Sequence, residues 1–185
     1  MKTYDRELEL GFEVSATKAM KIITRENLVI LQQNIIRQTW LEEGEIGDYK
    51  FHTRIRRTEI TYPNANGSWE GKCEFTTKYS KNDEQAAVQD NMELNAQITP
   101  EEYEKLKKIY EVAGKEEVVK IRTYFGTPLD ALSVYTLDTY PNEEGDRARI
   151  EIEFKSKEEM HRWKAPAWLK ELIGNEIKKG NEQEA

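Results

Sequence analysis

Apolar and polar residues alternate along several stretches of the chain, with the period of two that is typical of β-strands burying one face. Other stretches are rich in β-branched and aromatic residues, which also favour strands. Between two of these, the segment Pro-Asn-Ala-Asn-Gly-Ser at 63–68 is typical of a hairpin loop. The stretches that we predict to be strands are 5–14, 29–41, 50–62, 68–80, 116–125, 132–141 and 147–154.

Helical patterns are fewer and shorter. Residues 16–27 predict a short helix with Ala19, Ile22 and Ile23 on one side. The clearest helix begins after Thr99, a suitable N-cap, and Glu102 completes a capping box with it. Two further short helices are predicted near the end of the sequence, at 156–164 and 165–174.

Many strands in succession, joined by short turns and accompanied by a few helices, predict an α+β fold with an antiparallel sheet or barrel. The pattern is not the alternation of strand and helix that a parallel sheet requires. A length of 185 residues fits one domain over 1–185, with a loose tail at about 181–185.

The composition excludes several classes of function. Twenty-eight Lys and Arg against 35 Asp and Glu give a net charge of −7, which argues against a binder of nucleic acid or of anionic membranes. One cysteine, Cys73, and two histidines cannot form an internal disulfide or a Cys/His zinc site. No apolar stretch is long enough to span a bilayer, and the N-terminal segment has no signal-peptide core, so we expect a cytoplasmic protein.

The polar faces of the predicted strands are sorted by the sign of their charge. Three of these strands are apolar on the opposite face, for example at Leu8, Ile55 and Ile150. The residues that share a polar face are Glu7 with Glu9; Arg54 with Arg56; Lys72 with Glu74, Thr76 and Lys78; Lys120 with Arg122; and Glu151 with Glu153.

Two interpretations of this sorting remain open. A chain in which 34% of the residues are charged places such pairs on solvated strand faces, and charges on an edge strand discourage aggregation. Alternatively, the apolar faces pack outward against helices and the charged faces share an interior, where charges must pair or bind ions and ligands. Carboxylate pairs suit Mg²⁺ or Mn²⁺, and Arg and Lys suit phosphate oxygens. The second interpretation therefore predicts a site for a polyphosphate complexed with a divalent cation.

An ordered set of short segments extends over nearly the whole chain. They are Glu7-Leu8-Glu9-Leu10-Gly11-Phe12, Gln38-Thr39-Trp40-Leu41, Arg54-Ile55-Arg56, Thr76-Thr77-Lys78, Met92-Glu93-Leu94-Asn95, Lys120-Ile121-Arg122, Asp138, Glu151-Ile152-Glu153, and Gly174-Asn175-Glu176-Ile177 with Asn181. In order and spacing the set resembles the CYTH superfamily. These triphosphate tunnel metalloenzymes include thiamine triphosphatases, inorganic triphosphatases and class IV adenylyl cyclases.

The resemblance implies an eight-stranded antiparallel β-barrel with flanking helices, enclosing a tunnel for a triphosphate or nucleotide. It implies hydrolysis of an inorganic, nucleoside or other organic triphosphate with Mg²⁺ or Mn²⁺. The implied metal ligands are Glu7, Glu9, Asp138, Glu151 and Glu153, and the implied catalytic residues are Glu9, Glu151 and Glu153. The implied substrate-binding residues are Arg54, Arg56, Lys78, Lys120 and Arg122, with Lys72 as a competitor of Lys78 on the same strand face.

The sequence departs from the family pattern at three positions. Gly11 stands where the family has a Lys that contacts substrate, Asn95 stands where a second acidic residue is common, and Lys178 replaces a Thr. The change at Gly11 keeps open a second class of function, a protein that binds a nucleotide or polyphosphate without turning it over. A class IV adenylyl cyclase is a third alternative.

Overall fold

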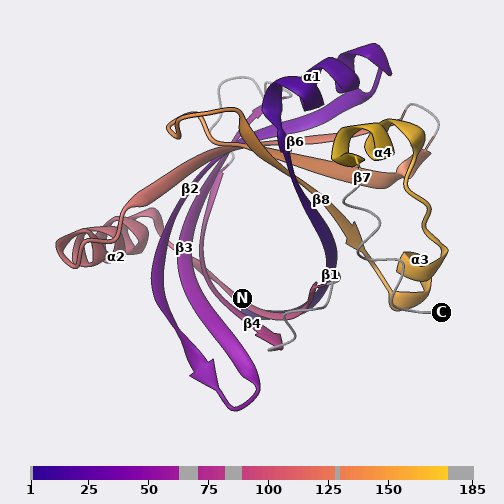
Figure 1. The fold of residues 1–185 in the computed structure, drawn as a ribbon. Coiled ribbons are helices and arrows are strands. Elements are labelled where there is room, and N and C mark those ends of the chain that lie inside the picture. Colours follow the sequence, from indigo (N-terminus) through magenta and orange to yellow (C-terminus); the bar gives the residue numbers. More distant parts are fainter. Residues whose placement is uncertain (1, 63–70, 82–88, 128–129, 175–185) are drawn as a thin grey trace.

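The computed structural model of the chain describes residues 2–62, 71–81, 89–127 and 130–174, and within these it leaves out the side chains of 2–7, 62, 89–90 and 130–133. Eight antiparallel strands form a closed barrel (Figure 1). The strands are β1 (Lys2–Ser15), β2 (Val29–Ile46), β3 (Tyr49–Tyr62), β4 (Gly71–Lys81), β5 (Gln89–Ile98), β6 (Glu117–Thr127), β7 (Asp130–Thr139) and β8 (Arg147–Phe154). The helices are α1 (Ala16–Arg25), α2 (Pro100–Val112), α3 (Lys157–Arg162) and α4 (Ala167–Ile173).

The order of strands around the barrel is β1-β5-β4-β3-β2-β6-β7-β8. Strand β1 closes the ring, because it pairs with β5 along one edge and with β8 along the other. The predicted α+β architecture, an eight-stranded antiparallel barrel with flanking helices, is therefore confirmed. The predicted hairpin loop at 63–68 and the predicted loose tail lie outside the described residues.

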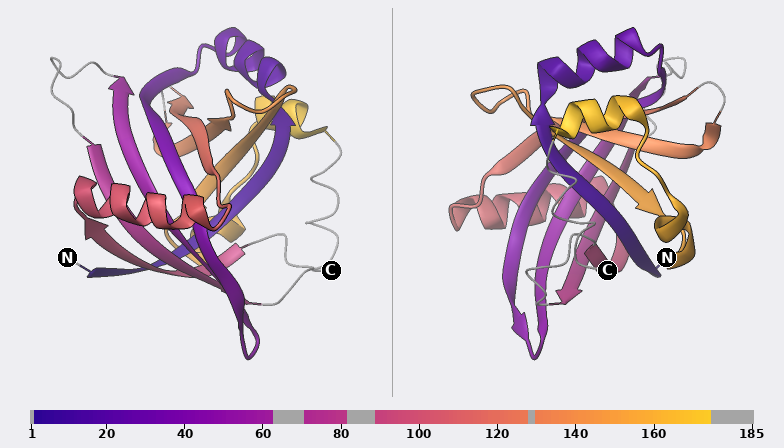
Figure 2. Two further views of the ribbon diagram at one scale, coloured as in Figure 1. Left: turned by 90° about the vertical axis from the view of Figure 1, so that its left-hand side faces the viewer. Right: turned by 45° about the vertical axis from the view of Figure 1, so that its right-hand side comes forward.

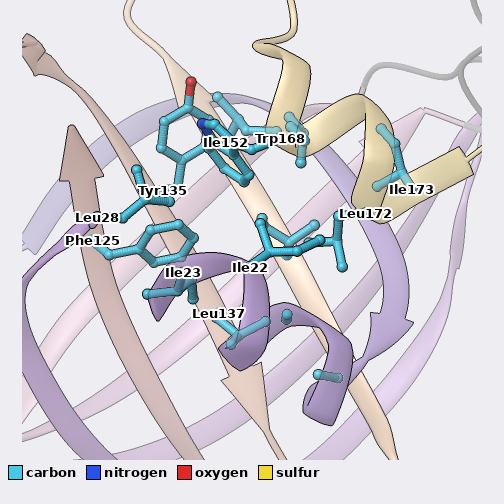
Figure 3. Packing of buried hydrophobic residues seen from close by; sticks show 14 of the residues in the cluster. Ile22, Ile23, Leu28, Phe125, Tyr135, Leu137, Ile152, Trp168, Leu172 and Ile173 are labelled. Atoms are coloured by element: carbon cyan, nitrogen blue, oxygen red, sulfur yellow. The ribbon is translucent and has the colours of Figure 1, made fainter. Parts of the chain in front are cut away.

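The apolar faces of the strands point outward, where helices cover them. Leu8, Ile150 and Ile152 are buried in a hydrophobic cluster that joins β1 and β6–β8 to α1 and α4. Figure 3 shows this packing, with Ile22 and Ile23 of α1 and Trp168, Leu172 and Ile173 of α4 placed over the strands. A second cluster lies under α2, on the outer side of β2–β4 (Figure 2), and contains Leu41, Ile55, Cys73 and Tyr103. Both hydrophobic cores of the described chain thus lie outside the barrel.

Helices α1 and α2 begin where the sequence predicts, whereas α4 begins at Ala167, two residues after the predicted start. The Ser15 side chain accepts a hydrogen bond from the backbone N–H of Lys18 at the start of α1, and Ala19, Ile22 and Ile23 are the buried residues of that helix. Thr99 and Glu102 form both bonds of the capping box at α2. These caps fix where the chain leaves each strand, and so which helix face meets the barrel.

The two tryptophans near the C-terminus belong to the packing outside the barrel. Trp168 is buried, with its ring 4.9 Å from that of Tyr135 and 5.8 Å from that of Phe125. Trp163 packs edge-on against Phe154 at 5.6 Å. Over the part of the chain that the structure describes, we find no helix with the length and apolar character needed to cross a membrane.

Candidate functional site

Charged side chains from strands that are not neighbours meet on the inner face of the barrel. Lys78 of β4 contacts Glu9 of β1 although β5 lies between these strands, and Arg122 of β6 contacts Glu151 of β8 across β7. Side chains can reach over an intervening strand in this way only on the concave side of a closed sheet. The structural part of the second interpretation, that charged strand faces share an interior, is therefore confirmed for these four residues.

One group of interior charges, which we call the Glu93 cluster, consists of Glu9, Arg54, Lys78 and Glu93. Lys78 Nζ lies 3.1 Å from Glu9 Oε1 and 3.8 Å from Glu93 Oε1. Arg54 Nη2 lies 3.3 Å from the same Glu93 oxygen. Asn95 donates a hydrogen bond to the other Glu93 oxygen at 3.3 Å. The two carboxylates are buried, and basic groups hold both of them.

A second group, the Asp138 cluster, consists of Lys120, Arg122, Asp138, Arg149 and Glu151. Asp138 is fully buried and accepts hydrogen bonds from Lys120 Nζ at 2.5 Å and from Arg122 Nε and Nη2 at 2.7 and 2.6 Å. Glu151 bridges two guanidinium groups, because Oε2 accepts from Arg122 Nη2 at 2.6 Å and Oε1 accepts from Arg149 Nε at 2.8 Å. Strands β4 and β7 lie four places apart in the ring of eight, so the two clusters occupy opposite walls.

Burial and charge pairing set the protonation of the Asp138 cluster. Burial would raise the pKa of Asp138, but the hydrogen bonds and charges of Arg122 and Lys120 outweigh it and lower the pKa to about 2. Burial and the nearby Arg122 lower the pKa of Lys120 to about 8, against the opposing effect of Asp138. At pH 7 the Asp138 carboxyl is therefore ionised and the Lys120 amine is mostly protonated. Because the pKa of Lys120 is close to 7, a small change in its surroundings can change its protonation.

Arg56 differs from the other interior cations. Within the described residues it has no ion pair, and its buried Nε atom, like that of Arg54, has no hydrogen-bond partner. Burial and the like charges of Arg54 and Arg122 lower its pKa to about 10. A guanidinium is expensive to bury without an anion. The position is therefore suited to an anion that the protein itself does not supply.

Aromatic rings lie beside Arg54 on the inner face. The guanidinium carbon of Arg54 is 5.4 Å from the ring centroid of Trp40, and His52 meets the same Trp40 ring edge-on at 4.7 Å. Burial, followed by the charges of Arg54 and Lys78, lowers the pKa of His52 to about 4. His52 is therefore neutral at pH 7, and it adds no charge to the Glu93 cluster.

The structure distinguishes between the two lysines that the sequence left as competitors. The side chain of Lys78 is 11% exposed and belongs to the Glu93 cluster. The side chain of Lys72 is 58% exposed and pairs with its neighbour Glu74 at 2.9 Å. Of these two lysines, Lys78 is the one that reaches the opposing acidic residues.

The other predicted site residues differ in where the structure places them, and the site contains residues that were not predicted. Glu153, paired in register with Glu9, is exposed, and the side chain of Glu7 is outside the described part. Sequence reasoning did not assign Glu93, Arg149, Trp40 or His52 to the site. Glu93 stood only within a segment of the family resemblance, and the spacing of Arg149 from Glu151 and Glu153 was the available signal. The predicted residues that the barrel brings together in its interior are Glu9, Arg54, Arg56, Lys78, Lys120, Arg122, Asp138 and Glu151.

The carboxylates fit a divalent cation only in part. Among the side chains that the structure describes, no three acidic, histidine or cysteine residues are clustered closely enough to hold a metal ion. To reach one, Asp138 would have to release Lys120 and Arg122. The neighbouring pair Glu9 and Glu153 fits better, because Mg²⁺ is usually bound by one or two carboxylates together with substrate phosphates and water.

A closed antiparallel barrel with hydrophobic cores outside and paired charges inside defines a CYTH-like fold, as the sequence resemblance implied. Solved structures share it: the PH1819 protein of Pyrococcus horikoshii OT3 (20% identity, TM-score 0.52, 83% of this chain and 82% of that one), and a conserved hypothetical protein of Pyrococcus furiosus (13%, 0.52, 84% and 82%). A third is HpAC1 from Hippeastrum, an adenylyl cyclase candidate described as having a dominant triphosphatase activity (14%, 0.52, 84% and 82%).

At these identities the likeness concerns the fold alone. No model of a known protein family matches the chain, and a search of curated proteins gives no match either. The site must therefore be interpreted from its own residues.

Proposed function

We propose that this protein hydrolyses a triphosphate in the interior of its barrel, with Mg²⁺ or Mn²⁺. The observation that carries the proposal is Arg56, an inward guanidinium without an ion pair in the described chain, beside the like charges of Arg54 and Arg122. Arg54 and Arg122 already have carboxylate partners, so the positive charge of Arg56 beside them is the part that an anionic ligand would neutralise. A linear triphosphate is such a ligand, because each of its phosphates can accept hydrogen bonds from a guanidinium.

The basic residues bind and align the ligand. Arg54 and Arg56 grip phosphate oxygens from β3, and Lys78 adds a charge from β4. Lys120 and Arg122 stabilise the negative charge that develops on the leaving diphosphate. Asp138 keeps these last two groups in place, since it holds both of them through short hydrogen bonds.

The carboxylates would hold a divalent ion and orient the attacking water. Glu9 and Glu153 are the residues that we assign to the ion, which, when bound, would neutralise phosphate charge and activate water. We assign Glu151, whose two oxygens accept hydrogen bonds from Arg122 and Arg149, to the water beside it. Burial would raise the pKa of Glu151, but Arg122 outweighs it and the pKa is lowered. A carboxylate with a lowered pKa is a weak base, so Glu151 orients the water more than it removes its proton.

The test is phosphate release from inorganic triphosphate, ATP and thiamine triphosphate, measured with Mg²⁺ or Mn²⁺ and again with EDTA. Release that stops with EDTA and returns with excess metal supports the proposal, and the relative rates rank the substrates. Formation of cyclic AMP and diphosphate from ATP would instead indicate a cyclase.

A second function, binding without turnover, is favoured by one observation. Gly11 removes a cationic side chain from the inner face of β1, at a position paired in register with Glu151. If the three compounds bind in calorimetry but release no phosphate with any metal, the protein is a polyphosphate- or nucleotide-binding protein and the hydrolase proposal is wrong.

A further inference from the structure

Gly11 lies on the inner face of β1, and a side chain from another strand occupies the space that a side chain at this position would need. A Cβ atom built on Gly11 would lie 2.1 Å from Nη2 of Arg149 and 2.6 Å from its Cζ. A Cβ atom does not approach a non-bonded atom more closely than about 3.0 Å, so one of the two groups would have to move. In this chain the absence of a side chain at Gly11 allows the guanidinium of Arg149 to lie against β1.

Two acidic residues hold Arg149 in this position. Its Nε donates to Glu151 at 2.8 Å, and its Nη1 lies 3.5 Å from Glu13. A guanidinium is not deprotonated in proteins, so Arg149 contributes a positive charge at this point of the wall. Glu13 belongs to β1 and Glu151 to β8, so the guanidinium spans the seam at which the barrel closes.

Arg149 remains accessible from the interior. Its side chain is 25% exposed, whereas that of Arg122, the other guanidinium on Glu151, is 10% exposed. Glu151 therefore holds one deeply buried and one partly exposed guanidinium, on its two oxygens. A phosphate oxygen that approaches this wall can meet the exposed one without breaking the bond from Nε.

We propose that Arg149 is a phosphate-binding residue of the site, and that Gly11 has the specific role of making room for it. The inference rests on the proposed function, since it assigns a further contact to the same polyphosphate ligand. Arg149 presents a planar group that can bind phosphate through two nitrogens. Arg149 thus supplies a positive charge where β1 meets β8, at the point where Gly11 has no side chain to supply one.

Arg147 provides a matched control. It lies two residues earlier on the same face of β8 and also pairs with Glu13, at 2.9 Å, but its side chain is 59% exposed. If Arg149 only neutralises acidic residues, removal of either arginine will have similar consequences. If Arg149 binds phosphate, only its removal will weaken the affinity for the ligand.

The experiment measures the dissociation constant of inorganic triphosphate by calorimetry, and the melting temperature, for Arg149→Ala, Arg147→Ala, Gly11→Lys and the double variant Gly11→Lys with Arg149→Ala. We expect the dissociation constant to be ten- to hundredfold larger in Arg149→Ala, which is the usual effect of losing a charge-assisted hydrogen bond. In Arg147→Ala we expect it to change less than twofold. Gly11→Lys alone should weaken binding, because the new side chain displaces Arg149 and repels it. In the double variant the lysine enters the vacated space, and we expect at least half of the loss to be recovered on a logarithmic scale.

The outcomes separate this inference from the proposed function. If the unaltered protein does not bind inorganic triphosphate, the proposed function is wrong and the inference falls with it. If the unaltered protein binds and Arg149→Ala binds equally well, or the double variant is no better than Arg149→Ala, the function stands and the inference is overturned. If Arg149→Ala does not fold, Arg149→Gln and Arg149→Lys replace it. The lysine must then bind more tightly than the glutamine, and equal affinities would overturn the inference.

Discussion

Replacement of Arg56 by methionine separates the stability of the barrel from its proposed function. The pKa of Arg56 is lowered from 12.5 to about 10, and at about 1.36 kcal/mol per pKa unit this corresponds to a penalty of about 3 kcal/mol for the charged form in the folded protein. Methionine keeps an unbranched apolar stem of similar reach without the charge. We therefore expect Arg56→Met to raise the free energy of unfolding by up to about 3 kcal/mol, and the melting temperature by roughly 6–12 °C at this chain length.

The same variant should bind the ligand more weakly. The proposed function assigns phosphate oxygens to Arg56, so the affinity for inorganic triphosphate should fall by about ten- to hundredfold in Arg56→Met. Denaturant unfolding measures the first effect and calorimetry the second. Denaturant unfolding is measured without and with ligand, because a bound ligand stabilises the folded state by an amount that rises with the logarithm of the ligand concentration divided by its dissociation constant.

Arg57 is the matched control for this experiment. It is the next residue of β3, points to the outer face, and pairs with Glu59 at 3.1 Å and with Glu104 of α2 at 3.5 Å. Arg57→Met should lower the stability slightly and leave the affinity for inorganic triphosphate unchanged. If Arg56→Met proves less stable than the unaltered protein, or binds the ligand as tightly, Arg56 is not an unpaired cation kept for an anion.

Three further predictions concern other parts of the molecule. In the free protein the His52 imidazole should titrate near pH 4 in an NMR experiment, and bound triphosphate should raise this pKa, while a pKa near 6.5 would contradict the burial. Because the folded pKa of His52 is lowered, its contribution to stability is present above pH 6.5 and is lost as the pH falls toward 4. Glu151→Gln should retain binding but reduce metal-dependent phosphate release by roughly 100-fold, and full activity would remove Glu151 from the catalytic group. Tyr103→Phe removes the 2.9 Å hydrogen bond to Glu117 outside the barrel, and should cost about 1 kcal/mol in denaturant unfolding with no change in kcat or KM.

The sequence alone was sufficient to predict which strand faces are charged. A period of two determines that Glu151 and Glu153 share a face and that Ile152 lies on the other, and closure of the barrel turns the first face inward. The same period applies to Lys72 and Lys78, and therefore could not distinguish them. Their depth depends on which strands lie across the interior, and this is fixed by the order of strands in the closed ring.

The partners of the charged residues could not be predicted from the sequence, because they too depend on the order and register of the strands. Asp138 was predicted to be a metal ligand, but in the structure it is paired with Lys120 and Arg122 of β6. These pairs form because β6 and β7 are neighbours whose register places Arg122 opposite Asp138. Arg149 was overlooked although it shares the face of Glu151, because the significance of that side chain depends on the absence of one at Gly11. Two residues 138 positions apart in the sequence become one structural unit only at the seam of the barrel.

The closing role of β1 also has consequences for how the chain folds. Leu8 of this strand pairs in register with Asp90 on one side and with Phe154 on the other, so both neighbours of the first strand are distant in sequence. Pairings of such large separation form slowly, because the loop entropy is lost before the contacts can compensate for it. During synthesis β1 is the first strand to emerge, yet it has no complete set of partners until β8 has followed it. The two charged walls therefore face one another only in the closed barrel, once β1 has paired with both β5 and β8.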